Sequence, residues 1–198
     1  MIERALTQDR ARPDVRVWIE YATVGALAFQ AAHLLEHTAQ LAYWFMNPTQ
    51  APWLTPWAQT GRDLLVVDGP TASGNEVLHL VGNLIFMAGI AGLWWLARQE
   101  GLGIGDVDHL RPAVTLQGIH VLEHSALTAS YLITGKALGA STLFGAAGGP
   151  FGSSLRVWSH FLLNLGASWY AYNAARFLWR RSISRTVGKP TRQGTNAV

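Results

Sequence analysis

Four long apolar stretches alternate with shorter polar ones along the chain. They cover roughly residues 18–46, 76–97, 113–135 and 156–179. Each is long enough to provide the roughly 20 residues that a helix needs to cross the hydrocarbon core of a bilayer. The stretches between them contain Pro and Gly pairs typical of loops, such as Gly69-Pro70 and Gly149-Pro150. The pattern predicts an all-α polytopic membrane protein with four transmembrane helices in a bundle.

The apolar stretches repeat in pairs. QAAHLLEHTAQLA at residues 30–42 matches QGIHVLEHSALTA at residues 117–129 without a gap. GPTASGNEVLHLVGN at residues 69–83 resembles GPFGSSLRVWSHFLLN at residues 149–164, with one extra residue in the second copy. The chain is therefore predicted to hold two tandem two-helix repeats, about 17–97 and 112–180. Parallel repeats of this kind are related by a pseudo-two-fold axis near the membrane normal.

Charge refines this picture. Only 14% of the residues are charged, against about 25% in ordinary soluble domains. Lys and Arg gather before the first stretch, between the second and third, and after the fourth, at Arg4, Arg10, Arg12, Arg16, Arg98, Arg111, Arg176, Arg180, Arg181, Arg185, Lys189 and Arg192. The positive-inside rule then predicts that both termini are cytoplasmic and that the protein is a multi-pass component of the plasma (inner) membrane.

The rest of the organisation follows. Residues 1–198 are predicted to form a single membrane domain, with residues 181–198 as a flexible cytoplasmic tail because they are polar and lack periodicity. The basic pI of 9.6 is explained by the cytoplasmic flanks. We expect the lipid bilayer, and no nucleic acid, among the partners. A partner membrane subunit or a homo-oligomer is compatible with a chain of this size.

The repeated motif HxxEH places polar side chains on one face of a helix, because positions i, i+3 and i+4 share a side. His79 and Asn83, and likewise His160 and Asn164, are also four residues apart. Buried polar groups in a membrane must face each other. The predicted metal ligands are His33, Glu36, His37, His79, His120, Glu123, His124 and His160. Gln30, Asn83, Gln117 and Asn164 are predicted to orient the ligands from a second shell.

The donor types limit the metal. The chain has no cysteine, so the ligands are nitrogen and oxygen atoms. Six histidines and two glutamates exceed the need of one tetrahedral ion and predict two transition-metal ions, with iron or copper favoured over zinc. The expected site lies in the outer half of the bilayer, since His79 and His160 come near the start of their helices.

Three functions remain open at this point. The first is a membrane-bound metal-dependent oxidoreductase or oxygenase that acts on a lipid-soluble substrate or quinol. The second is an electron carrier in which the histidines bind haem b. The third is a metal or proton transporter. A buried His–Glu network without metal is the purely structural alternative. The sequence does not distinguish a catalytic site from a transporting or a structural one.

Overall fold

The computed structural model describes residues 15–47, 53–64, 72–147 and 152–187. These residues form six helices and no strand: α1 (Val15–Met46), α2 (Pro56–Leu64), α3 (Ala72–Gln99), α4 (Leu110–Thr134), α5 (Ala140–Ala147) and α6 (Gly152–Val187). The all-α prediction is confirmed for this part of the chain. Arg4, Arg10, Arg12, Lys189, Arg192 and the pairs Gly69-Pro70 and Gly149-Pro150 lie outside the described residues.

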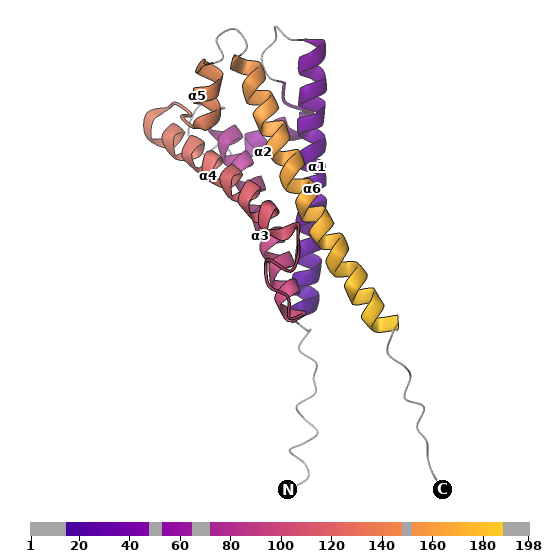
Figure 1. The fold of residues 1–198 in the computed structure, drawn as a ribbon. Coiled ribbons are helices and arrows are strands. Elements are labelled where there is room, and N and C mark those ends of the chain that lie inside the picture. Colours follow the sequence, from indigo (N-terminus) through magenta and orange to yellow (C-terminus); the bar gives the residue numbers. More distant parts are fainter. Residues whose placement is uncertain (1–14, 48–52, 65–71, 148–151, 188–198) are drawn as a thin grey trace, which may run out of the picture.

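The four long helices run in alternating directions (Figure 1). α1 and α4 each pack against both α3 and α6. The short helices lie at one end of this bundle, where α2 contacts α3 and α5 contacts α6. We call this the α2/α5 end. The opposite end holds the turn between α3 and α4, together with the first residues of α1 and the last described residues of α6.

The helix bounds differ from the predicted ones in two places. α2 and α5 lie in stretches predicted as loops. α6 continues to Val187, so residues 181–187 are helical although they were predicted to belong to a flexible tail. The polar composition of these residues is compatible with an exposed helix. The first stop signals in the sequence come only at Gly188 and Pro190.

A continuous apolar core fills the bundle on the side away from α2 and α5. It includes the fully buried Phe86 and Ile90 of α3, Leu110 of α4 and Ala171 of α6. α1 and α3 approach each other closely in this region. A Cβ atom at Gly89 would lie 2.7 Å from the Cβ of Ala26. Small residues that permit such contact are typical of helix pairs in membranes, where packing replaces the hydrophobic effect.

Glycine residues also set two helix ends. Gly101 has φ of 72° and follows the last turn of α3, where the Leu102 N–H donates to the Ala97 carbonyl at 3.0 Å. Gly135 has φ of 70° and its N–H donates to the Tyr131 carbonyl at 2.8 Å. These left-handed conformations favour glycine and complete the helix ends. The chain therefore turns sharply into the next element after α3 and after α4.

Charged groups tie the opposite end together. The Arg16 guanidinium donates to Glu20 at 2.8 Å and to Glu100 at 3.1 Å, which joins the start of α1 to the end of α3. The hydrogen bond from Arg16 to Glu20, followed in size of effect by the one to Glu100, raises the pKa of Arg16. The Arg16–Glu20 pair is exposed, and exposed pairs contribute about 0–1 kcal/mol to stability. The main effect of the two bonds is to define the α1–α3 contact at this end.

One segment of the described chain, Gly74–Gln99 in α3, is long and apolar enough by itself to cross a membrane. A buried helix of a soluble protein can meet the same criterion. The criterion thus identifies one candidate span where the sequence pattern predicts four. Many large apolar side chains nevertheless point outward from the other long helices, including Leu35 of α1 (67% exposed), Leu122 of α4 (71%) and Trp169 of α6 (64%).

Candidate metal centre

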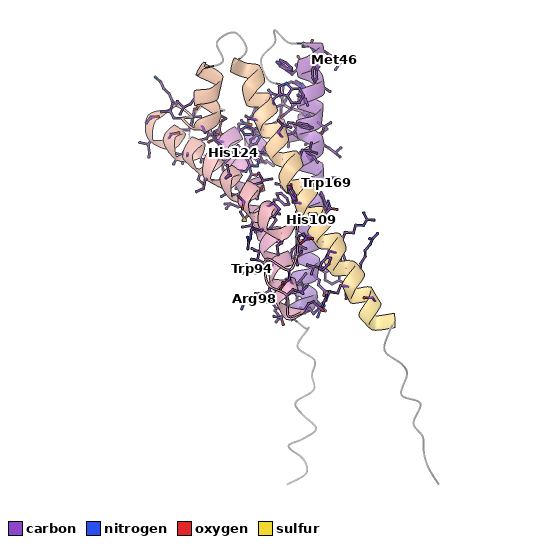
Figure 2. All side chains as sticks on the ribbon, viewed as in Figure 1. Met46, Trp94, Arg98, His109, His124 and Trp169 are labelled. Atoms are coloured by element: carbon purple, nitrogen blue, oxygen red, sulfur yellow. The ribbon has the colours of Figure 1, made fainter. Side chains whose placement is uncertain are left out.

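Six imidazoles lie together between the four long helices. We call them the histidine cluster: His33 and His37 from α1, His79 from α3, His120 and His124 from α4, and His160 from α6. Figure 2 places His124 in the half of the bundle that carries α2 and α5. The remaining histidine, His109, lies nearer the opposite end, where its ring contacts Tyr170.

The cluster has two sides: His33, His37 and His79 form one, and His120, His124 and His160 the other. The distances between neighbouring rings are similar on both sides. The ring centroids of His33 and His37 are 4.6 Å apart, and those of His120 and His124 are 4.9 Å apart. Two contacts join the sides: His79 to His124 at 5.2 Å and His37 to His160 at 6.1 Å. The two HxxEH faces are therefore linked inside the bundle through His79 and His160.

Two pairs of ring nitrogens come close. The Nε2 atoms of His124 and His160 are 2.9 Å apart, and those of His33 and His37 are 3.2 Å apart. Two imidazoles bound to one tetrahedral ion at about 2.0–2.1 Å would place their nitrogens about 3.3 Å apart. Each pair therefore has a separation close to that of two ligands of one metal, as well as that of a hydrogen bond.

The α4–α6 side is the more compact of the two. One nitrogen from each of His120, His124 and His160 can be chosen so that all three lie within 4.8 Å of one another. All three side chains are buried. Within the described residues, neither ring nitrogen of the fully buried His120 has a hydrogen-bond partner, and the same is true of His124 Nδ1. A buried polar group without a partner costs about 1–3 kcal/mol, and metal ligation would remove that penalty.

Two other rings are held by their Nδ1 atoms. His79 Nδ1 donates to the Asn75 carbonyl at 2.8 Å, and His37 Nδ1 donates to Gln40 Oε1 at 3.0 Å. A proton on Nδ1 leaves the lone pair on Nε2, the arrangement usual for a metal-binding histidine. Sequence reasoning missed Gln40, although its position three residues after His37 on the same helix signals contact.

The two glutamates of the motif have other partners. Glu36 accepts hydrogen bonds from the backbone N–H and the hydroxyl of Thr55, which precedes α2. Glu123 accepts from the Ala140 N–H at 2.8 Å, and from the N–H and hydroxyl of Ser141 at 2.8 and 2.7 Å, at the start of α5. A carboxylate at a helix N-terminus satisfies free N–H groups and interacts favourably with the helix dipole.

The structure therefore offers Glu36 and Glu123 a role different from the predicted metal ligation. Each carboxylate fixes the short helix that follows its own long helix. Glu36 also reaches the histidine cluster indirectly, because the Gln40 side chain donates to Glu36 at 3.0 Å while accepting from His37. Sequence spacing alone could not show this, since it depends on how the chain returns after α1 and α4.

A third carboxylate, Glu76 of α3, was not predicted. It is 6% exposed, and its Oε2 lies 3.9 Å from His124 Nδ1. A carboxylate behind a ligating histidine is a common second-shell arrangement at metals. Its signal in the sequence is the spacing of three residues to His79. It was missed because the second repeat carries Val157 at the matching position.

The four predicted second-shell amides lie one turn beyond the cluster and bind each other rather than the rings. Gln30 Nε2 donates to Asn164 Oδ1 at 3.1 Å, and Gln117 Nε2 donates to Asn83 Oδ1 at 2.9 Å. Asn83 and Asn164 in turn donate to the carbonyls of His79 and His160. The amides thus connect α1 to α6 and α4 to α3, and they hold the backbone of two histidines.

Two cavities adjoin the cluster. One has a volume of about 270 Å³ and is lined by His37, His79, His124 and His160 together with groups from the α2/α5 end. The other, about 200 Å³, lies between α1, α2 and α3 and is lined mainly by apolar groups such as Phe29 and Trp57. The cluster is thus accessible to water and small molecules. The cavities are smaller than the about 300–1,000 Å³ usual for drug-sized ligands.

Comparison with known proteins gives one match. The model of a family described as a family of unknown function (DUF6008) matches residues 5–196, and the chain belongs to this family. No curated protein and no solved structure matches the chain significantly. The chemistry of the site must therefore be argued from its own residues.

Proposed function

We propose that this member of the DUF6008 family is an integral membrane oxidoreductase with a histidine-rich dinuclear metal centre. The observation that carries the proposal is the meeting of six imidazoles from four helices, with His120 buried and lacking any hydrogen-bond partner among the described residues. Neutral imidazole is the commonest protein ligand for transition metals.

The membrane bundle is supported by an arrangement in which polar groups point inward. On α1 the polar Gln30 and His37 are buried, while the apolar Leu35 and Phe45 are 67% and 60% exposed. A criterion based on mean hydropathy averages the two faces and underrates such a helix. Lipid would cover the outer faces of all four long helices, and the buried polar groups would satisfy one another, as a bilayer requires.

The two-repeat organisation is supported by matched contacts. The Gln30–Asn164 hydrogen bond has its counterpart in Gln117–Asn83. Glu36 and Glu123 each bind the start of the following short helix. We therefore propose four transmembrane spans, α1, α3, α4 and α6, with a pseudo-two-fold axis near the membrane normal and both termini in the cytoplasm.

Topology can be tested with single cysteines, because the chain has none. A cysteine at Gly103, in the α3–α4 turn, should react with a membrane-impermeant thiol reagent only from the cytoplasmic side. A cysteine at Lys136, in the turn before α5, should react only from the outer side. Labelling of both positions from one side of intact cells or vesicles would contradict the four-span arrangement.

The metal centre is proposed to hold two ions with three imidazoles each. His120, His124 and His160 form one set, and His33, His37 and His79 the other. Because both motif glutamates are engaged by α2 and α5, the donor set is nitrogen alone. This shifts the preference from iron, which is common in carboxylate-rich sites, toward copper, which binds nitrogen ligands more tightly than other divalent first-row metals.

Oxidoreduction is the chemistry that such a pair of ions supplies best. Two ions that each change charge by one would accept the two electrons that a hydroquinone releases when it becomes a quinone, while its two protons pass to a protein group and to water. The protein contributes a buried site, fixed imidazoles and the nearby Glu76 carboxylate, which could receive a proton. Haem is less well supported, because the rings contact one another and the adjoining cavities of about 270 and 200 Å³ are small.

Transport is less well supported for a different reason. Beyond the amides Asn83 and Asn164, the buried described residues are mainly apolar, including Phe86, Ile90 and Ala171, and the buried polar ones are the hydroxyl residues Thr23 and Ser168. A cation path through the bundle would need further polar groups in this region. The site is therefore proposed to be reached from the α2/α5 end only.

Metal analysis of the detergent-purified full-length protein tests the proposal. We expect about two copper or iron ions per chain and no Soret absorption. A Soret band with one iron per macrocycle would instead show that the histidines bind haem. Protein that remains metal-free after exposure to Cu²⁺, Fe²⁺ and Zn²⁺ would leave the cluster as a buried hydrogen-bonded network, and the proposal would be wrong.

A further inference from the structure

The larger cavity beside the histidine cluster has features of a binding site. Its volume is about 270 Å³. It is lined by four imidazoles and by aromatic and amide groups of α1, of α3 and of residues 53–54. It thus joins the cluster to the α2/α5 end of the bundle. A molecule in it would touch the proposed metal ligands directly.

Two residues that line this cavity, Trp44 and Asn75, each carry a buried polar atom without a partner. The indole N–H of Trp44 and the Oδ1 of Asn75 are buried, and neither makes a hydrogen bond within the described residues. The first is a donor only and the second an acceptor. Leaving both unpaired costs free energy, which a ligand could recover. A hydroxyl group, which donates and accepts, suits this pair.

The remaining lining favours a flat, uncharged ligand. The rings of Tyr43 and Trp53 stack at 5.2 Å with an interplanar angle of 25°, which provides an aromatic wall. The buried Glu76 carboxylate disfavours an anion. Metal ions on the neighbouring imidazoles would disfavour a cation. A volume below the drug-sized range limits the occupant to about one ring.

The cavity also breaks the two-fold pattern of the cluster. Gln40, Trp44 and Glu76 all line it. The aligned positions in the second repeat are Leu127, Tyr131 and Val157. The indole, amide and carboxylate groups of the lining therefore come from the first repeat, whereas the second repeat contributes His124, His160 and Val157. A symmetric set of imidazoles is combined with an access site on one side only, as a site for a single substrate molecule would be.

We propose that this cavity binds a monocyclic phenol or hydroquinone, with its hydroxyl group between Trp44 and Asn75 and its ring beside Tyr43 and Trp53. The inference rests on the proposed function, whose substrate class it names. Binding through the hydroxyl would hold the ring against His37, His79, His124 and His160.

Binding of two probes to the full-length protein in lipid nanodiscs tests this. 4-Ethylphenol and ethylbenzene differ only in the hydroxyl group, and equilibrium dialysis against empty nanodiscs corrects for partition into lipid. We expect the protein to bind 4-ethylphenol at least about fivefold more tightly than ethylbenzene. This is the affinity ratio that corresponds to the net contribution of one neutral hydrogen bond. Trp44→Phe and Asn75→Ala should each remove most of this preference.

Trp57→Phe is the matched control, because Trp57 lines the other cavity and its replacement should leave the preference intact. Equal binding of both probes, or an unchanged preference in both Trp44→Phe and Asn75→Ala, would overturn the inference. Metal content is measured on the same samples. Preference for 4-ethylphenol in a protein that binds no metal would refute the metal centre alone, and two ions with equal binding of the probes would refute the phenol site alone.

Discussion

Replacement of His120 by Phe is expected to abolish metal binding on the α4–α6 side of the cluster while leaving the metal-free protein at least as stable as the parent. His120 is fully buried, and neither of its ring nitrogens has a hydrogen-bond partner in the described residues. Phe fills a similar space and removes the unpaired polar group, whose burial costs about 1–3 kcal/mol. In the loaded protein, the same change removes one of three imidazoles from the ion.

Thermal unfolding with and without metal, together with elemental analysis, measures this effect. A ligand at 100 times its dissociation constant stabilises the folded state by about 2.7 kcal/mol. The parent protein should gain at least this much on loading, and the His120→Phe variant should gain much less and lose about half of its metal. His109→Phe, which changes the histidine outside the cluster, should behave like the parent.

An unchanged metal content in the His120→Phe variant would exclude His120 as a ligand. A variant that is more stable than the parent both with and without added metal would support a cluster whose histidines are only packing groups. The test therefore separates the metal centre from the structural alternative without relying on loss of folding.

The second large effect is expected at Glu123, where replacement by Ala should release α5 from the bundle. The carboxylate accepts three hydrogen bonds from Ala140 and Ser141. Hydrogen bonds to a charged group contribute about 1.5–3 kcal/mol each, so Glu123→Ala should lower the free energy of unfolding by about 3 kcal/mol or more. Glu123→Gln should have a smaller effect, because its oxygen can still accept from Ser141.

Hydrogen exchange at the amides of Ala140 and Ser141, read beside metal content, distinguishes the two roles of this glutamate. If Glu123 caps α5, Glu123→Gln increases exchange at these amides and leaves the metal stoichiometry unchanged. If Glu123 is a metal ligand, as the motif suggests, Glu123→Gln lowers the metal content while exchange stays slow. Glu20→Gln, at the exposed pair with Arg16, is the control and should change stability by less than about 1 kcal/mol.

Under the two proposals, different sets of residues in the bundle have different roles. The repeated residues build the imidazole cluster and anchor the short helices. Residues that differ between the matching segments, Glu76 and Trp44 among them, join four of the histidines in lining the larger cavity.

The sequence by itself determined the long helices and the faces that meet between them. Residues that are three or four positions apart lie on the same side of a helix, whatever surrounds it. This puts His33 and His37 on one face, and likewise His120 and His124. The motif occurs twice in the chain, which gives two such faces, and polar faces in an apolar chain must find each other. These are local properties of the backbone, combined with one general cost of burying polar groups. They were sufficient to identify all six histidines that the structure brings together.

Only the tertiary structure decided which polar group each of these faces meets. The HxxEH spacing puts Glu36 and Glu123 beside the histidines, but the carboxylates bind Thr55 and Ser141 instead, because the chain folds back after α1 and α4 and presents free N–H groups there. Glu76 reaches His124 through the packing of α3 on α4, and the one-sided cavity arises where α1, α3 and α6 leave space. Such contacts depend on distances between separate segments, and helical periodicity carries no information about them.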